Sequence, residues 1–361
     1  MMDRKIYIVY GNRAKQMTME LMEAARISEE IPQGASVALK PNLVVAAEPE
    51  YGATTHAGIL EGVIEYLQDH GHRDISIMEG AWVGDRTERG FAVCGYNEIG
   101  RRYNVPLYDL KRDSTRPVKT RVGQIRICER ALNAGYLINL PVLKGHCQTV
   151  MTCALKNMKG CLPDTEKRHF HTMGLHRPIA ALNAALKPAL TIVDNICGDL
   201  NFEEGGNPVP TNRMMLGHDP VQLDALGCRL MGIDMRDVEY IGYAEEWGVG
   251  SSEIADGDLI YLNEPKVAIA PQRPSGLAAR LGKNVKQKSA CSACYGNLIH
   301  ALYQYQEREG RAFGALISIG QGFDGQELPG IGVGRCCRGA ERCAMGCPPS
   351  AETILHMLME E

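Results

Sequence analysis

The sequence predicts an α/β protein in which a mostly parallel sheet carries helices on both faces and is followed by a small cysteine-rich subdomain. Short apolar, β-rich runs alternate with amphipathic helical patterns through about the first 270 residues. Such alternation is typical of parallel sheets, because parallel strands need a helical crossover between them. Six of the thirteen cysteines fall after residue 290. The expected division is therefore an α/β ligand-binding domain at 1–270 and the cysteine-rich subdomain at 271–361.

The first three expected strands and the two helices between them establish a β-α-β-α-β order. Strand patterns lie at 5–10, 36–40 and 74–78. Apolar residues at helical spacing cover 17–28 and 56–70. This order predicts that helices cover both faces of the sheet.

The same alternation continues through the middle of the chain. Further strands are expected at 136–140, 189–194 and 258–262, with helices at 178–186 and 220–231. A glycine between two alternating runs predicts a hairpin at 118–130. The stretch 264–290 carries three prolines and no acidic residue after Glu264, so we interpret it as the connector into the cysteine-rich part.

Composition excludes several classes of partner. The 39 basic and 43 acidic residues give a formal charge of -4, which provides no large field for attracting nucleic acid or an anionic membrane. No apolar run approaches the roughly 20 residues that cross a bilayer, and charged residues interrupt the N-terminus where a signal peptide would be apolar. We therefore expect a cytoplasmic protein. In that reducing compartment, thirteen cysteines indicate metal or redox chemistry more than disulfides.

The C-terminal cysteines have the spacing of a metal site. Cys291 and Cys294 are separated by two residues, which lets both sulfurs converge on one centre. About 40 residues later, Cys347 is followed by two prolines, as in ferredoxin-type runs that end in Cys-Pro. This pattern predicts one [4Fe-4S] cluster. The alternatives are a four-thiolate zinc site and, less consistent with a reducing compartment, a disulfide-linked appendage.

The segment from Gly332 to Leu358 resembles the cluster motif of hydrogenase small subunits and of the related quinone-reductase subunit. In those proteins a cysteine pair, an isolated cysteine and a Cys-Pro-Pro cysteine hold one [4Fe-4S] cluster. The ligands that this resemblance implies are Cys291, Cys294, Cys336 and Cys347. The sequence departs from the motif because it also carries Cys337 and Cys343, either of which can take the place of Cys336.

Polar residues recur where four expected strands end. The loops concerned begin at Lys40, Glu79, Lys144 and Asp194. Carboxyl ends of parallel strands share one edge of a sheet, and ligands bind in the crevice there. We therefore expect these loops to converge on one pocket.

A basic stretch at 154–177 follows the third of these loops and favours a small anionic ligand. The candidate anion-binding residues are Lys40, Asn42, Lys144, Lys156 and Lys159. The candidates for catalysis and proton transfer are Glu79, His146 and Asp194. The alternative for the basic stretch is a solvated surface. His169 and His171 lie there without acidic or cysteine partners at firm spacing, so they do not predict a second metal site.

Four segments together resemble the family called domain of unknown function 362. These are KPNL at 40–43, LPVLKGH at 140–146, ALKNMKG at 154–160 and the segment around Asp194. The resemblance covers most of 35–235, and many members of the family also carry iron-sulfur cysteines. It implies the α/β architecture and the cluster, but no reaction.

These observations lead to one main hypothesis and two alternatives. The main hypothesis is a cytoplasmic [4Fe-4S] protein that acts as a redox enzyme on a small anion held in a basic crevice. A single cluster transfers one electron at a time, so a redox partner protein is implied. The alternatives are a lyase or isomerase with a structural cluster, and a non-catalytic electron carrier or assembly factor whose crevice would be shallow or filled. Nucleic acid and membranes are not expected partners, and a homodimer remains open.

Overall fold

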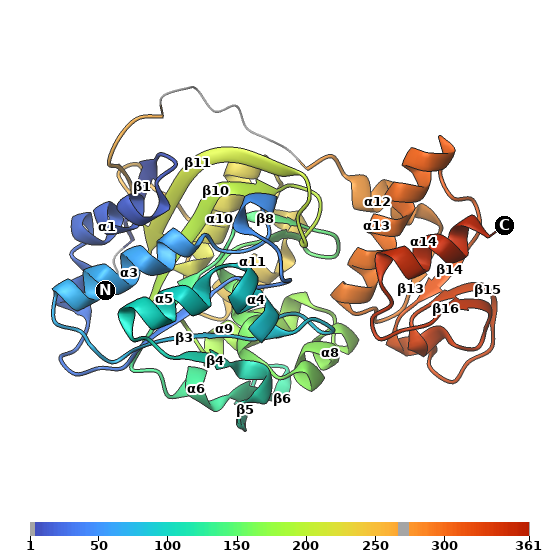
Figure 1. Cartoon of the computed structure of the whole chain (residues 1–361), viewed down its shortest axis with the longest axis horizontal. Helices are drawn as coiled ribbons and strands as arrows, with labels where there is room; N and C mark the ends of the chain where they lie inside the picture. Colours follow the sequence, from blue (N-terminus) through green and yellow to red (C-terminus); the bar gives the residue numbers. More distant parts are fainter. Residues whose placement is uncertain (1–3, 266–273, 361) are drawn as a thin grey trace.

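The computed structural model describes residues 4–265 and 274–360, and Figure 1 shows them as a large body joined to a smaller C-terminal one. In the described ranges the large body contains an eight-stranded sheet of order β12-β1-β11-β10-β7-β2-β3-β4. Its strands are β1 (Ile6–Tyr10), β2 (Val37–Pro41), β3 (Ile75–Glu79), β4 (Leu107–Asp109), β7 (Tyr136–Leu140), β10 (Leu190–Asp199), β11 (Pro208–Gly217) and β12 (Leu259–Tyr261). The expected boundary after residue 270 lies outside the described residues.

The sheet is mostly parallel, which confirms the prediction. Among its described strands, β11 alone runs antiparallel to its neighbours, β1 and β10. The other pairs are parallel. All six strands expected in this body are present, whereas β4 and β11 were not predicted. The β11 segment, PVPTNRMMLG, begins with two prolines and polar residues, so its sequence does not show a strand pattern.

Helices cover both faces of the sheet, as expected. One face packs against α1 (Ala14–Ala24), α3 (Ala57–Asp69) and α5 (Tyr96–Tyr103). The opposite face packs against α7 (Ala154–Asn157), α9 (His176–Ala185), α10 (Pro220–Met231) and α11 (Glu239–Glu246). Along β2, Val37 and Leu39 contribute to the first core and Ala38 to the second, because successive strand residues point to opposite faces. Strand β2 is consequently buried along its whole length.

Short elements complete the large body. The predicted hairpin is present as the antiparallel pair β5 (Thr115–Thr120) and β6 (Gly123–Cys128). A second antiparallel pair consists of β8 (Lys144–His146) and β9 (Val150–Thr152). The remaining helices are α2 (Ile27–Glu30), α4 (Thr87–Val93), α6 (Glu129–Leu132) and α8 (Asp164–Thr172). No helix within the described ranges combines the length and apolar character needed to cross a lipid bilayer.

The C-terminal body has a sheet and a core of its own. Its parallel strands are β13 (Val285–Gln287), β14 (Ile317–Ile319), β15 (Leu328–Val333) and β16 (Ala340–Ala344). Its helices are α12 (Leu277–Leu281), α13 (Ser292–Glu309) and α14 (Ala351–Met359). The apolar residues of this unit form a separate cluster, to which the large body contributes Phe202. The N-terminus of α13 faces the large body, and the candidate site lies there (Figure 1).

Candidate functional site

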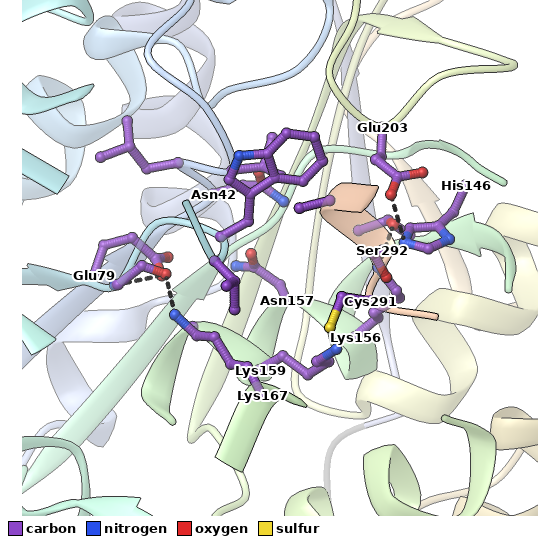
Figure 2. Close-up of a pocket in the computed structure, with 18 of the residues that line it drawn as sticks. Asn42, Glu79, His146, Lys156, Asn157, Lys159, Lys167, Glu203, Cys291 and Ser292 are labelled. Carbon is purple, nitrogen blue, oxygen red and sulfur yellow. Dashed lines mark hydrogen bonds and ion pairs between the residues drawn. The ribbon is translucent and has the colours of Figure 1, made fainter. Parts of the chain in front are cut away.

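A cavity of about 100 Å³ lies between the carboxyl edge of the large sheet and the first turn of α13. The end of β3, the loop after β2, and β8 form one part of its wall, and Cys291, Ser292 and Ala293 form another. Figure 2 shows Glu79 and Lys167 on one side of it, with His146, Glu203 and Cys291 on the opposite side. This volume has room for several water molecules or a small ligand.

Three of the four loops expected to converge do so. Asn42 follows β2, Glu79 ends β3, and Lys144 and His146 belong to β8, and all four residues line the cavity. Because β2, β3 and β7 are parallel neighbours, their carboxyl ends meet at one edge. The fourth loop, at Asp194, does not contribute to the lining.

Asp194 instead belongs to a separate buried network. Its carboxylate accepts hydrogen bonds from the backbone N–H of His56 at 2.9 Å and contacts the His56 Nδ1 atom at 2.7 Å. Burial opposes protonation of His56, but the carboxylate prevails and raises the pKa of His56 to about 11. The contacts of Asp194 are therefore those of an ion-pair partner that positions the start of α3.

Lys40 forms a buried ion pair with Glu79. The carboxylate of Glu79 also accepts a hydrogen bond from the N–H of Gly80 at 2.7 Å. Burial raises the pKa of Glu79, and the ammonium group of Lys40 offsets part of this effect. Gly160 packs on the pair so closely that a Cβ atom there would lie 1.8 Å from Glu79 Oε1. Glu79 lines the cavity and Lys40 does not, so Lys40 acts on the cavity through Glu79.

Lys144 joins three loops. Its ammonium group donates to the carbonyl of Ala53 at 2.5 Å, the carbonyl of Glu203 at 2.8 Å and Asn42 Oδ1 at 3.3 Å. Burial, followed by the charge of Lys156, lowers the pKa of Lys144 to about 7. An ammonium group has three N–H donors, and here each has an acceptor. Lys144 therefore holds the walls of the cavity together.

Lys156 and Lys159 keep donors available for a ligand. The nitrogen of Lys156 contacts Thr152 Oγ1 at 3.4 Å, and that of Lys159 contacts His171 Nε2 at 3.4 Å. Neither amine has a carboxylate within ion-pair distance among the described residues. Burial lowers the pKa of Lys156 to about 8 and that of Lys159 well below its usual value. These two amines face the cavity without a carboxylate at ion-pair distance in the described residues.

His146 presents one ring nitrogen to the cavity. Its Nδ1 accepts hydrogen bonds from the N–H groups of Gln148 at 3.0 Å and Thr149 at 3.2 Å. Burial lowers the pKa of His146 well below its usual value, so the ring is neutral and its proton is on Nε2. That nitrogen lies 3.2 Å from Glu203 Oε1, which accepts no hydrogen bond from the described residues. The Nε2–H is therefore a donor available to a ligand.

His146, Cys147 and Glu203 also form a group of metal-ligand types. Their ligand atoms lie within 4.8 Å of one another, and the many cysteines of the chain are likewise compatible with a metal cofactor. Histidines that bind metal usually donate a hydrogen bond through the second ring nitrogen, whereas Nδ1 of His146 accepts two. The charges of Lys144 and Lys156 also act on His146. Both features favour a hydrogen-bond network over a cation at this group.

The four predicted cluster cysteines act electrostatically on one another, and Cys337 acts on Cys294 as well. Cys291 precedes the first residue of α13, and Cys294 lies in its first turn. The pKa of the Cys291 thiol is raised to about 11. Burial is the largest cause, Cys336 and Cys347 act in the same direction, and Arg168 opposes them. Burial is also the largest cause that raises the pKa of Cys294, and Cys291, Cys347 and Cys336 each raise it as well.

The two additional cysteines of this segment have other contacts. The thiol of Cys337 is fully buried and approaches the carbonyl of Gly320 at 4.0 Å. The thiol of Cys343 donates to the carbonyl of Gly334 at 3.6 Å. All thirteen cysteines lie in the described part of the chain and are free thiols there.

The loop after β3 packs against the Cys-Pro-Pro turn. Gly84 has a φ of +104°, and a Cβ atom on it would lie 2.3 Å from Cδ of Pro348. Ser292 Oγ donates to Gln148 Oε1 at 2.7 Å, and its backbone N–H donates to His171 Nε2 at 3.3 Å. The cysteine segment is thus joined to the cavity wall by direct contacts.

Sequence reasoning did not select several lining residues. These are Trp82, Lys167, His171, Glu203 and Ser292. Lys167 and His171 belong to the basic stretch that was noted, so a signal was present. Glu203 follows β10 in a polar loop, and nothing in its local sequence distinguishes it from a solvated acid.

Comparison with known proteins gives a family and two distant structural likenesses. The chain is 24% identical over 231 residues to "Thylakoid-associated protein sll1697" from Synechocystis sp. strain PCC 6803, covering 61% of this chain and 70% of that protein. The lactate racemase apoprotein from Thermoanaerobacterium thermosaccharolyticum has a TM-score of 0.44 at 11% identity, covering 64% of this chain and 59% of that one. A Thermotoga maritima protein from a structural genomics consortium has a TM-score of 0.41 at 12% identity, covering 61% and 60%.

The chain spans less than two thirds of either solved protein, and likenesses at these scores carry no functional argument. The family model described as "Domain of unknown function (DUF362)" matches residues 37–229. This match includes the loop after β2, the end of β3, and β8, which contribute residues to the cavity wall. Because the match covers more than half of the chain, this protein belongs to the DUF362 family.

Proposed function

We propose that this protein binds one [4Fe-4S] cluster and is a redox enzyme acting on a small anion held in the cavity. The proposed cluster ligands are Cys291, Cys294, Cys336 and Cys347. The observation that carries the proposal is that Cys291 belongs to the same cavity wall as Lys156 and Lys159. A ligand in the cavity would therefore be next to the metal centre.

The four cysteines fit a cluster better than a single zinc ion. A tetrahedral zinc with Zn–S bonds of about 2.3 Å would hold its sulfurs roughly 3.8 Å apart. In the described residues, no three of these four sulfurs form a group within 4.8 Å, which favours a larger inorganic core. Gly334 supports the same fit, because its φ is +89° and a Cβ atom there would lie 3.7 Å from the Cys294 sulfur.

The cavity has three features that suit an anion. Lys156 and Lys159 present amines without a protein counter-ion. The N-terminus of the 18-residue helix α13 contributes Ser292 and Ala293 to the wall, and helix N-termini stabilise negative charge. The Nε2–H of His146 adds a neutral donor. Together these groups can bind and orient a carboxylate or phosphate.

The protein residues around the ligand can also supply protons. When bound, a [4Fe-4S] cluster supplies one-electron transfer at the cavity wall. Burial raises the pKa of Glu79, which lines the side opposite Cys291 (Figure 2), so we assign its carboxyl group to proton exchange with a bound ligand. Lys156, with a pKa lowered to about 8, can exchange one. Asp194 is outside the lining, so we assign it no proton transfer.

The cavity favours an enzyme over the electron-carrier alternative. A carrier would need no ligand site, and its crevice was expected to be shallow or filled. Instead, a cavity of about 100 Å³ lies beside the cysteines. One-electron transfer still implies a redox partner protein, and thirteen free thiols suit the reducing cytoplasm.

Anaerobic purification followed by iron and acid-labile sulfide analysis tests the cluster. We expect close to four iron and four sulfide per chain, and an electron paramagnetic resonance signal after reduction with dithionite. Cys294→Ser and Cys347→Ser should each lose most of the iron. Cys94→Ser is the matched control, because this buried thiol contacts the carbonyl of Ala47 and lies outside the cysteine segment. Stoichiometric zinc without sulfide would refute the proposal.

A further inference from the structure

Cys291 belongs to two sites at once. Its thiol is among the four grouped cysteines, and the residue also lines the cavity. The next two residues, Ser292 and Ala293, are the first turn of α13 and line the cavity as well. No other layer of protein therefore separates an anion at this wall from a cluster held by Cys291.

The positive charge around Cys291 is shared between the two sites. Lys159 lines the cavity and acts electrostatically on the Cys291 sulfur. Arg168 acts on the sulfurs of Cys291 and Cys336 but is not part of the cavity lining. Lys159 thus serves both the anion and the cysteine site, whereas Arg168 serves the cysteine site alone.

We propose that anion binding in the cavity and reduction of the cluster are coupled because the two sites share Cys291, so that a bound anion lowers the midpoint potential and reduction releases the anion. This inference rests on the proposed function, since it needs both the cluster and the anion site. It adds a regulation that the proposed function does not require.

The direction of the coupling follows from charge. Reduction adds one negative charge to the cluster, and a bound anion repels it, so the anion opposes reduction. By linkage, reduction weakens anion binding by the same factor. For unit charges roughly 10 Å apart at an effective dielectric constant of about 20, that factor is about tenfold. A tenfold change in affinity corresponds to about 59 mV for a one-electron couple.

The test measures the midpoint potential of the anaerobic full-length protein with and without saturating inorganic phosphate. Calorimetry of phosphate binding to the oxidised and the dithionite-reduced protein gives the same quantity independently. We expect phosphate to lower the potential by about 59 mV, and reduction to weaken phosphate binding about tenfold. Acetate, which carries less charge, should produce a smaller shift.

Two variants separate anion binding from a general effect of charge near the cysteines. Lys159→Met removes an amine from the cavity wall, so it should raise the phosphate concentration at which the shift is half complete, with iron and sulfide content unchanged. Arg168→Gln should lower the potential but keep the shift, because its side chain does not line the cavity.

The outcomes distinguish this inference from the proposed function. If phosphate binds and the cluster is present but the potential does not move, the coupling is refuted and the proposed function stands. The same phosphate dependence of the shift in Lys159→Met and in the unmodified protein would also refute it, because the shift would then not come from an anion in the cavity. Absence of iron and sulfide, or failure of both phosphate and acetate to bind, would overturn the proposed function together with the coupling.

Discussion

The buried ion pair of Lys40 and Glu79 provides a quantitative test of how the cavity is built. The side chain of Lys40 is 0% exposed and that of Glu79 is 3% exposed. Glu79→Gln would leave the ammonium group of Lys40 buried without its counter-charge. Its acceptors would then be neutral: the carbonyl of Pro41 at 3.1 Å and the amide oxygen of the glutamine. We therefore expect Glu79→Gln to lower the free energy of unfolding by about 3 to 5 kcal/mol.

A double-mutant cycle separates the cost of an unpaired charge from the value of the pair. Replacing both residues, as Lys40→Met with Glu79→Leu, removes both charges and keeps side chains of similar size. We expect this double variant to be at least about 2 kcal/mol more stable than Glu79→Gln, because apolar replacement of a buried pair is often neutral. Surface ion pairs contribute only about 0 to 1 kcal/mol, so the expected loss cannot be mistaken for one.

Urea unfolding followed by circular dichroism measures both values. Arg236→Ala is a suitable control, because it removes an exposed ion pair with Asp234 and should change stability by less than about 1 kcal/mol. A loss below about 1 kcal/mol for Glu79→Gln would show that Lys40 is neutral or reaches solvent. In that case the assignment of Lys40 as the charge partner of Glu79 would be wrong.

Three further predictions concern the cysteine segment, the anion and the effect of pH. Gly84→Ala should reduce the iron content several-fold while the circular dichroism spectrum is kept, because its Cβ atom would collide with the Cys-Pro-Pro turn; unchanged iron content would contradict this. Phosphate affinity should fall at least about tenfold in Lys156→Ala but not in the exposed control Lys119→Ala. In the unmodified protein, phosphate affinity should fall as the pH rises through about 8, where Lys156 loses its proton. A pH-independent affinity would remove Lys156 from the anion site. The pKa of His56 is raised from 6.5 to about 11, so its ion pair should stabilise the protein fully below pH 6.5 and progressively less as the pH rises towards about 11. Urea unfolding at several pH values should show a smaller decline of the free energy of unfolding in His56→Gln. An equal decline in both proteins would contradict the ion pair.

Lys40, Lys144, Lys156 and Lys159 illustrate how far the local sequence could predict the site. The sequence placed Lys40 and Lys144 at the ends of expected strands and Lys156 and Lys159 in the basic stretch that follows; the last three line the cavity. Their roles differ because of partners distant in the chain. Lys40 meets Glu79, and Lys144 meets carbonyls at Ala53 and Glu203, whereas Lys156 and Lys159 meet no carboxylate among the described residues. No local pattern contains this information, since each pairing depends on which loops approach one another.

The strands that were missed have a similar explanation. Strand β11 pairs with β10 from Thr191 to Asp199, with a register shift between Asn195 and Cys197, although its own pattern is polar at the start. Strands β13 and β14 contain only three residues each, too few for a periodic pattern. Their pairing partners and the common core supply the order that their sequences lack.

The sequence by itself determined the βα alternation of this protein, the mostly parallel sheet, and the cysteine pattern with its Cys-Pro-Pro ending. These features are local, because periodicity and spacing along the chain set which face a residue occupies and which neighbours its backbone can bring close. The tertiary structure alone decided that the first turn of α13 closes the cavity and that Asp194 pairs with His56. It also decided that two of the four lysines keep donors for a ligand. Those outcomes depend on packing between segments more than 100 residues apart, where burial removes water and leaves each charge to the partner that the fold provides.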